Sequence, residues 1–342
     1  MNSGDIFASP KGKYEIERRL GNGAFGIVYL SNYTPANSTT SMQVAVKEIA
    51  RNYNNRETCK KEEELLKTIS TSFTSEHVVK YIDSFADGDI TVPSKIHSLS
   101  LFSLTTKYML PNEDGKLFIT MEFCSGGDLA SKINEKIESG SEFDKETIFA
   151  YMSQIVDGID ELHIKHKIVH RDLKSANILI KEENGREVLK ISDLGLAKLL
   201  NYDTVAANYP KWYGTPLYWA PEQEKGEKVQ LSADIWAIGI IFYELCIAPR
   251  KLCDDHMHIR GKVERNEQIS LPPRFHEHDT LLLNRMLVKD PSGRSTIRNI
   301  CFPSRIDNLY YNLVRRMSDD EGAWKPIEPI TKEEFIPEIP EI

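Results

Sequence analysis

The sequence feature that most constrains this chain is a polar segment, His170–Asn177, set between two short apolar runs. Apolar runs of this length read as strands, so the polar segment between them is presented at one edge of a core. It carries a carboxylate at Asp172, a cation at Lys174 and an amide at Asn177, and a second carboxylate, Asp193, follows in a tight turn. These four side chains are the first candidates for a functional site.

The chemistry of these groups suits a reaction at a phosphate. An Asp and an Asn supply the hard oxygen ligands that divalent metals prefer, the other Asp can accept a proton from a hydroxyl, and the Lys can neutralise phosphate. A single loop Asp is more often a solvated carboxylate, but this combination at this spacing is rarely a product of chance. The segment matches His-Arg-Asp-Leu followed by three residues and Asn, and the chain therefore resembles the eukaryotic protein kinases.

Near the N-terminus, glycines at positions 21, 23 and 26 let a backbone approach phosphate without obstruction by side chains. Dinucleotide-binding folds share this spacing, but they need a helix directly after the last glycine. Here residues 27–30 are β-branched and aromatic and read as a strand, and a second strand carries residues 44–47. The glycines therefore read as the turn of a hairpin, which the resemblance makes the lid over the ATP phosphates.

Lys47, at the end of the second of these strands, is the residue that the resemblance assigns to the α- and β-phosphates. A Lys in such a place is otherwise an ordinary surface cation. Its anionic partner is expected on a helix over residues 60–69, where apolar side chains share one face and three glutamates precede them. The family's spacing selects Glu62, with Glu63 as the alternative, and a solvated acidic face is the other interpretation of all three glutamates.

A strand over residues 116–121 runs into a segment whose paired glycines mark a hinge between two lobes. In the resembled family, backbone groups of the hinge pair with adenine, which implies the Glu122 carbonyl and the Cys124 amide. Met121 is then the residue that guards the inner pocket. Asp128 lies where an acidic residue meets the ribose, and it is equally suited to cap the helix that follows.

The resemblance implies ATP and Mg²⁺ as cofactors. In this assignment Asp172 takes the proton of the acceptor hydroxyl, and Lys174 balances charge on the transferred phosphoryl group. The residues assigned to catalysis are Asp172, Lys174, Lys47 and Glu62, and those assigned to the metal are Asn177 and Asp193. The residues assigned to the nucleotide lie in the glycine loop, its neighbouring strands, the hinge and the metal pair: Leu20, Gly21, Asn22, Gly23, Ala24, Phe25, Gly26, Val28, Ala45, Lys47, Met121, Glu122, Cys124, Asp128, Asn177 and Asp193.

The fold class that follows is α+β, a bilobal protein-kinase-like fold with a small β-rich N-lobe and a larger, mainly helical C-lobe. The expected boundaries are 14–123 for the N-lobe, 124–305 for the C-lobe and 306–342 for an extension with an acidic, Pro-rich tail. The stretch over about 86–115 is longer than the family usually has. It is either an insertion that binds a regulatory partner or a longer β-ribbon.

Composition excludes other classes of protein. Residues 318–342 hold eight acidic and two basic residues of a chain whose net charge is −8, so the rest is nearly neutral and lacks the basic character of a nucleic-acid-binding protein. The five cysteines are scattered, without the paired spacing of a zinc site, and fit reduced thiols in the cytoplasm or the nucleus. No apolar run reaches membrane-spanning length, since the one over 236–248 is interrupted by Glu244, and the first residues show no secretory signal.

Two features narrow the expected activity. Lys174 after the proton acceptor, together with Thr215 near a Pro, resembles serine/threonine kinases rather than tyrosine kinases. The run over residues 121–131 is similar to the NIMA-related group. The function implied is transfer of the γ-phosphoryl group of ATP to Ser and Thr hydroxyls of protein substrates. A catalytically weak pseudokinase or scaffold is the alternative.

Control of this activity is expected at Arg171, a cation that can bind a phosphate on the segment before Thr215. The position that many relatives modify is Lys211 in this chain, and Lys cannot be phosphorylated in that way. Either Thr204, or next Tyr209, takes over this role, or the segment is ordered without a phosphate.

The resemblance also pairs Glu222 with Arg294 inside the large lobe and lets Asp234 brace the catalytic loop. Leu194 stands where the family usually has Phe, and it can pack against a neighbouring helix in the same way. The residue patterns themselves predict a loop, a strand and a helix over residues 31–42, 77–82 and 149–165, respectively.

Overall fold

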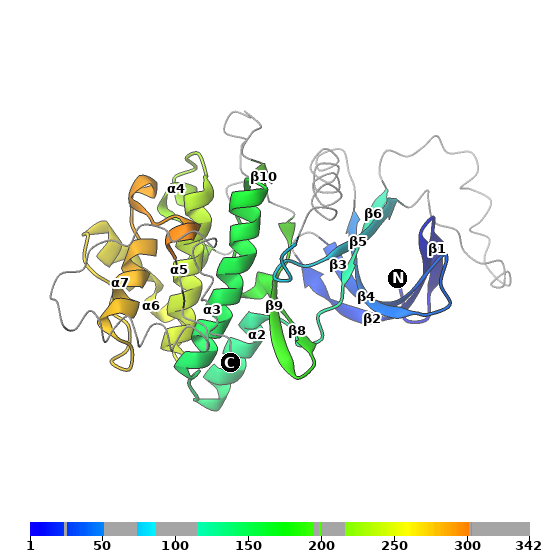
Figure 1. The fold of residues 1–342 in the computed structure, drawn as a ribbon, viewed down its shortest axis with the longest axis horizontal. Coiled ribbons are helices and arrows are strands. Elements are labelled where there is room, and N and C mark those ends of the chain that lie inside the picture. Colours follow the sequence, from blue (N-terminus) through cyan, green and yellow to red (C-terminus); the bar gives the residue numbers. More distant parts are fainter. Residues whose placement is uncertain are drawn as a thin grey trace, which may run out of the picture. The chain divides into compact units, whose positions relative to one another are not determined.

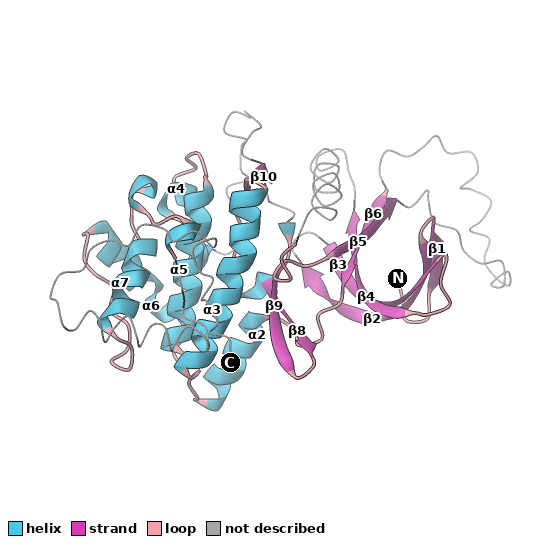
Figure 2. Cartoon of the chain, in the orientation of Figure 1, coloured by secondary structure: helices cyan, strands magenta, loops and turns pink. Residues whose placement is uncertain are grey.

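The computed structural model describes residues 1–23, 26–50, 74–86, 115–194, 198–199, 216–300 and 302. Within residues 1–302 the strands of one sheet gather on one side and the helices on the other (Figures 1 and 2). The α+β, bilobal organisation predicted from the sequence is therefore confirmed. The expected helix over 60–69, most of the long stretch over 86–115 and the acidic tail lie outside the described residues.

The small lobe is a six-stranded antiparallel sheet in the order β1-β2-β3-β4-β6-β5. β2 and β3 form the hairpin expected from the glycine spacing, with Gly23 opposite Gly26 at its tip. β5 and β6 are hydrogen-bonded neighbours, and they are joined by the long stretch of chain between them. The strands are β1 (Ile6–Ser9), β2 (Gly12–Gly23), β3 (Gly26–Pro35), β4 (Met42–Ala50), β5 (Tyr81–Ala86) and β6 (Lys116–Glu122).

β1 precedes residue 14, where the sequence places the start of the small lobe, yet it belongs to this lobe. It pairs with β2 and inserts Phe7 into an aromatic cluster, where the Phe7 ring stacks on Tyr14 at 5.0 Å between centroids. Tyr14 stacks in turn on Tyr33 at 4.7 Å, and Phe85 lies 5.3 Å from Phe118. These rings are all buried, so they supply a core for one face of the sheet.

The large lobe is organised around α5 (Leu231–Ile247), which is apolar on all sides and almost completely buried. Such a helix is a core element rather than an amphipathic surface helix. α3 (Lys145–Asp160) packs beside it with its buried side chains at helical spacing, as the sequence predicts. The other α-helices among the described residues of this lobe are α2 (Leu129–Ser139), α4 (Pro221–Glu224), α6 (Leu252–Glu264) and α7 (Glu277–Met286).

Two short ladders carry the functional segment in the large lobe. β7 (Ile168–Val169) pairs with β10 (Lys198–Leu199), and β8 (Ile178–Glu183) pairs with β9 (Arg186–Ile191). The polar segment predicted from the sequence thus lies between β7 and β8, as expected from its apolar flanks.

Three local predictions need correction. The loop expected over 31–42 is shorter, because β3 continues to Pro35 with Tyr33 turned into the aromatic cluster. The strand expected over 77–82 is divided: Val78 forms an isolated bridge with Ile191 of the large lobe, and β5 begins only at Tyr81. The helix expected over 149–165 begins four residues earlier, at Lys145, and its last turn, over 161–165, is a π-helix.

Candidate active site

The backbone of the catalytic loop is held by one buried carboxylate, Asp234 on α5. Its Oδ2 accepts from the backbone N–H of His170 at 2.8 Å, and its Oδ1 accepts from that of Arg171 at 2.9 Å. The ring of His163 lies 2.8 Å from Oδ2. Burial alone would raise the pKa of Asp234, but His163 and these hydrogen bonds hold the pKa below its usual range. The predicted brace is therefore confirmed.

Asp172, the expected proton acceptor, is held by two neighbours in the same loop. The Nζ of Lys174 lies 2.8 Å from its Oδ2, and the Asn177 amide donates to its backbone oxygen at 2.7 Å and to Oδ2 at 3.2 Å. The preceding residue, Arg171, has a φ of 75°, a left-handed conformation that turns the chain at this point. The structure thus brings together the carboxylate, the cation and the amide that the sequence singles out.

Asp193 joins this group from the end of β9. The backbone N–H of Ser192 donates to the Asn177 carbonyl at 2.9 Å, which fixes the start of the turn, and Asp193 itself has a φ of 61°. Its Oδ1 accepts from the Nζ of Lys47 at 2.9 Å. Burial alone would raise the pKa of the Asp193 carboxyl, but the charge and the hydrogen bond of Lys47 hold the pKa below its usual range.

The residues present fit a magnesium ion. Among the described residues, neither the Asn177 amide oxygen nor the second Asp193 oxygen has a hydrogen-bond partner, although Asn177 is buried. Two hard oxygen atoms on neighbouring segments, one of them on an ionised carboxylate, are the ligands Mg²⁺ takes together with phosphate oxygens and water.

Lys47 reaches this group from the small lobe. It lies on β4, buried, and is paired in the sheet with Val28 of β3, so the strand that follows the glycine turn runs directly beside it. The last glycine of the turn, Gly26, has a φ of 146°, and a Cβ there would lie 2.1 Å from the Glu48 carbonyl oxygen. The side chain of any other residue would push β3 away from β4 at this point. Glu62, Ala24 and Phe25 lie outside the described residues.

The hinge connects the two lobes by backbone hydrogen bonds to β8. The N–H of Gly126 donates to the Ile180 carbonyl at 2.8 Å, and a Cβ at Gly126 would meet the Ile180 side chain at 2.8 Å. Cys124 is buried, and burial raises the pKa of its thiol to about 12. Asp128 caps α2, because its carboxylate accepts from the Ser131 N–H at 2.9 Å. The capping prediction is confirmed.

The other residues assigned to the nucleotide lie on the same strands and on the hinge. Ala45 is buried on β4 and is paired with Met121 of β6, which is partly buried. Leu20 and Asn22 lie on β2 and are exposed. The described residues of this set thus come from adjacent strands and from the segment that leaves β6.

The segment that precedes α5 is anchored by the predicted pair of Glu222 and Arg294. Two parallel hydrogen bonds of 2.6 Å join the guanidinium and the carboxylate, and both side chains are almost fully buried. Leu194 is also buried in the large-lobe core, as its predicted packing requires. The sites proposed for modification, Thr204 and Tyr209, lie outside the described residues, as do Lys211 and Thr215.

A chain of buried and partly buried polar groups, which the sequence analysis missed, also reaches the catalytic loop. The Tyr218 hydroxyl lies 2.8 Å from the Ser175 hydroxyl and donates to the Glu244 carboxylate at 2.8 and 2.9 Å. Burial raises the pKa of Glu244 to about 7. The signal in the sequence was Glu244, a carboxylate near the end of a mostly apolar helix, but its partners are distant in the chain.

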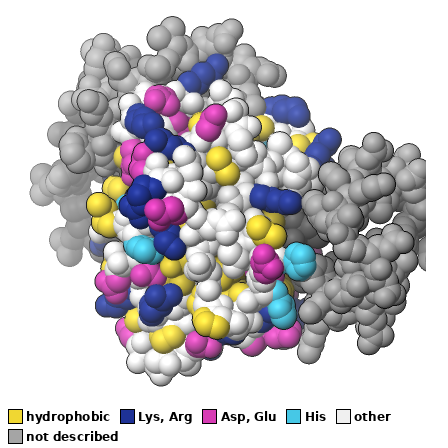
Figure 3. Space-filling model, turned by 90° about the vertical axis from the view of Figure 1, so that its left-hand side faces the viewer, with side chains coloured by type: hydrophobic (Ala, Val, Ile, Leu, Met, Phe, Trp, Pro, Cys, Tyr) yellow, Lys and Arg dark blue, Asp and Glu magenta, His cyan; other side chains and the backbone are white. Residues whose placement is uncertain are grey.

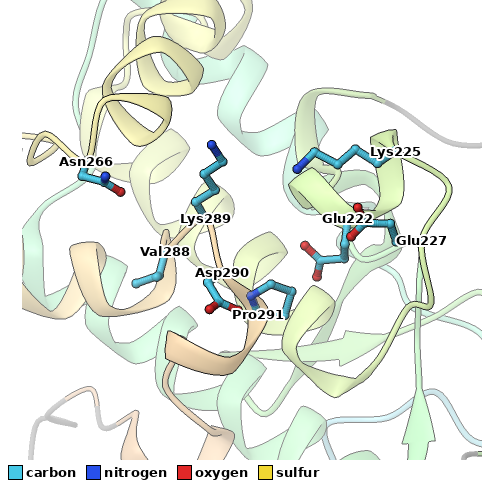
Figure 4. A pocket seen from close by; sticks show the side chains of 8 residues that line it. All are labelled: Glu222, Lys225, Glu227, Asn266, Val288, Lys289, Asp290 and Pro291. Carbon is cyan, nitrogen blue, oxygen red and sulfur yellow. The ribbon is translucent and has the colours of Figure 1, made fainter.

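A surface cavity of about 300 Å³ lies beside Glu222 rather than at the catalytic loop (Figure 4). Lys225 and Lys289 line it together with the acidic Glu227 and Asp290, so its charges are mixed. On the face seen in Figure 3, basic and acidic side chains are also interspersed. No helix of the described residues is long and apolar enough to cross a membrane.

Comparison with known proteins gives a consistent result. The family model for the protein kinase domain matches residues 14–303. A probable serine/threonine-protein kinase nek2 of Dictyostelium discoideum is 28% identical over 90% of this chain and 68% of its own length. The human kinase Nek2 is 32% identical over 60% of this chain and 46% of its own length, and human Nek11 is 29% identical over 90% and 42%. The chain thus spans less than half the length of these human relatives.

Proposed function

This chain belongs to the protein kinase family and is a serine/threonine kinase similar to the NIMA-related group; from that premise we propose that its catalytic loop transfers the γ-phosphoryl group of ATP to Ser and Thr hydroxyls of protein substrates. The observation that carries the proposal is the convergence of Asp172, Lys174, Asn177 and Asp193, with Lys47 on Asp193. A spread-out phosphoryl-transfer transition state needs this combination of positioned charges.

In the proposed reaction, the Asp172 carboxylate orients the acceptor hydroxyl and takes its proton. Its orientation is supported by the Asn177 amide, and the Nζ of Lys174, 2.8 Å away, supplies positive charge where the phosphoryl group passes. Asn177 and Asp193 are the residues that would hold Mg²⁺, which supplies further charge neutralisation when bound. Lys47 would hold the phosphates that are not transferred, and Glu62 would hold Lys47.

The nucleotide is proposed to bind between the glycine turn and the hinge. The Glu122 carbonyl and the Cys124 N–H would pair with adenine, with Met121 beside the ring, and Asp128 would meet the ribose while it caps α2. The flanking surfaces would come from the residues assigned on β2, β3 and β4. A bound adenine would thus lie on the backbone segment that joins the two lobes.

Control is proposed at two places. Arg171 would bind a phosphate on Thr204, added by the enzyme itself, and this phosphate would order the segment before Thr215. The stretch over about 86–115 would bind a regulatory protein. A cytoplasmic or nuclear location is supported by the free thiols of Cys124, Cys246 and Cys253.

The test is the Asp172→Asn variant, with ATP-dependent labelling of a generic acceptor protein. Asn keeps the shape of the side chain but cannot take the proton, so we expect phosphotransfer to fall by several orders of magnitude. ATP affinity, measured by calorimetry, should persist because Asp193 and Lys47 are intact. Wild-type protein that binds ATP but labels no acceptor would favour the scaffold, and predominant phosphotyrosine in the product would contradict the proposed acceptor.

A further inference from the structure

The side chain of Glu122, at the end of β6, is the centre of an ion cluster that no step of the proposed reaction uses. Its two carboxylate oxygens contact two different cations of the large lobe. Oε1 lies 3.0 Å from the Nζ of Lys190, and Oε2 lies 3.0 Å from the Nζ of Lys181. Oε1 also accepts from the backbone N–H of Lys80 at 2.7 Å. The Glu122 and Lys190 side chains are only 13% and 7% exposed.

The cluster joins three segments that are distant in the sequence. Lys190 donates a second hydrogen bond, of 2.7 Å, to the carbonyl of Glu76. The segment that starts there is docked on β9, since the N–H of Val79 donates to the Ile191 carbonyl at 2.9 Å. The carboxylate of Glu122 therefore ties the first hinge residue both to the β8–β9 hairpin and to the chain that enters β5.

The position of the β8–β9 hairpin shows which parts of the proposed site this cluster connects. β8 begins directly after Asn177, and β9 ends directly before Ser192 and Asp193, so the two proposed metal ligands lie at the open end of the hairpin. Lys181 and Lys190 lie along the same hairpin, which Figure 1 shows at the border between the sheet and the helices. The adenine end and the metal end of the proposed nucleotide site are thus connected through one rigid ladder and one carboxylate.

We infer that the Glu122 side chain is a positioning residue for the nucleotide: with Lys190 it sets the place of the adenine-binding hinge backbone relative to Asn177 and Asp193. The inference rests on the proposed function and deepens it. Contacts to adenine help to place the phosphates for reaction only when the hinge backbone and the proposed metal ligands are the right distance apart. A loosened hinge therefore weakens ATP binding without changing the groups around the acceptor hydroxyl.

The experiment compares Glu122→Gln, Lys190→Met and the double variant with wild type. We expect the KM for ATP and the calorimetric Kd for MgATP to rise about tenfold in Glu122→Gln, with kcat and the KM for the acceptor protein within about twofold. The double variant should regain part of the affinity, because it removes the buried Lys190 cation, which the single change leaves without its carboxylate partner. The matched control is Glu183→Gln, which removes a more exposed carboxylate that forms an ion pair with Lys181 and should leave the Kd within about twofold.

A purely structural role would lower thermal stability but leave the Kd of the folded protein unchanged, and that result would overturn the inference. An equal rise in the KM for the acceptor protein would overturn it as well. Should Glu122→Gln fail to fold, Glu122→Asp replaces it, because it keeps the charge but is too short to reach both lysines. An unchanged Kd for MgATP in that variant would also overturn the inference. Failure of the proposed function is separate, because it appears as wild-type protein that binds no ATP or labels no acceptor.

Discussion

The catalytic loop and the neighbouring Asp193 are held by different kinds of contact, one from within the large lobe and one from the small lobe. Asp234 holds the loop through hydrogen bonds in a fully buried setting, whereas Lys47 reaches Asp193 at a place where the Asp193 side chain is 25% exposed. Buried hydrogen bonds to a charged group are costly to break, and a partly exposed ion pair is cheaper to rearrange. The loop is therefore tied to the folding of the large lobe, while the contact from the small lobe can adjust to a nucleotide.

The sharpest test of the large-lobe side is Glu222→Gln. It leaves the Arg294 guanidinium, which has no exposed side-chain surface, without its anionic partner, so we expect a loss of about 3–5 kcal/mol in the free energy of unfolding. Urea denaturation measures this loss. The double variant with Arg294→Met should regain most of it, and a loss below about 1 kcal/mol in the single variant would contradict the assumed burial cost.

For the small lobe, Phe7→Ala should lower the free energy of unfolding by about 3 kcal/mol, because it removes a buried ring from the aromatic cluster. Hydrogen exchange should then accelerate in β1 and β2 but not in α5, if the two regions are stabilised separately. Lys13→Ala, a change at an exposed side chain on the same β-hairpin, is the control. Equal acceleration in α5 would show that the two regions unfold together.

The Asp234→Asn variant tests whether Asp234 holds the backbone of the catalytic loop in place. The amide retains one acceptor oxygen, so it loses one of the two backbone hydrogen bonds that hold the loop. We expect kcat to fall about a hundredfold, equivalent to about 2.7 kcal/mol, with little change in the KM for ATP. Steady-state kinetics with varied ATP separates the two, and a rise in KM alone would place the effect on the nucleotide side.

The smallest expected effect is the pH dependence of Glu244. Its folded-state pKa of about 7 lies above the ordinary value of 4.5, so its contribution to stability is complete below pH 4.5 and is lost as the pH rises through 7. Glu244→Gln cannot lose a proton and should gain about 2 kcal/mol over wild type between pH 5 and pH 8. Urea denaturation at pH 5 and at pH 8 measures this difference. The same change in the free energy of unfolding with pH in both proteins would refute it.

The sequence was sufficient for what depends on local order along the chain. The segment from His170 to Asn177, the hairpin tip between Gly23 and Gly26, and the capping of α2 by Asp128 were all predicted, because each is defined by residues a few positions apart. The assignment of Glu222 to Arg294 needed the family resemblance, since the two are far apart in the sequence.

The sequence was insufficient where a contact depends on tertiary pairing. β1 is four residues long and has no pattern of its own; it is a strand because β2 offers a partner and the aromatic cluster buries Phe7. Val78 lies in a run typical of a strand, but it bridges to Ile191 in the other lobe. The side-chain partners of Glu122 and Glu244 likewise come from segments that no local pattern connects to them.

The pairing of β5 with β6 has a consequence for protein engineering. Ala86 lies opposite Leu117 in the ladder, so the two ends of the long stretch between these strands are fixed side by side by the sheet itself. Closing a loop between fixed ends depends only weakly on its length, at about 0.6 kcal/mol for each doubling. This position can therefore accept a short designed turn or an inserted reporter domain, and the lobe that carries Lys47 should still assemble around either one.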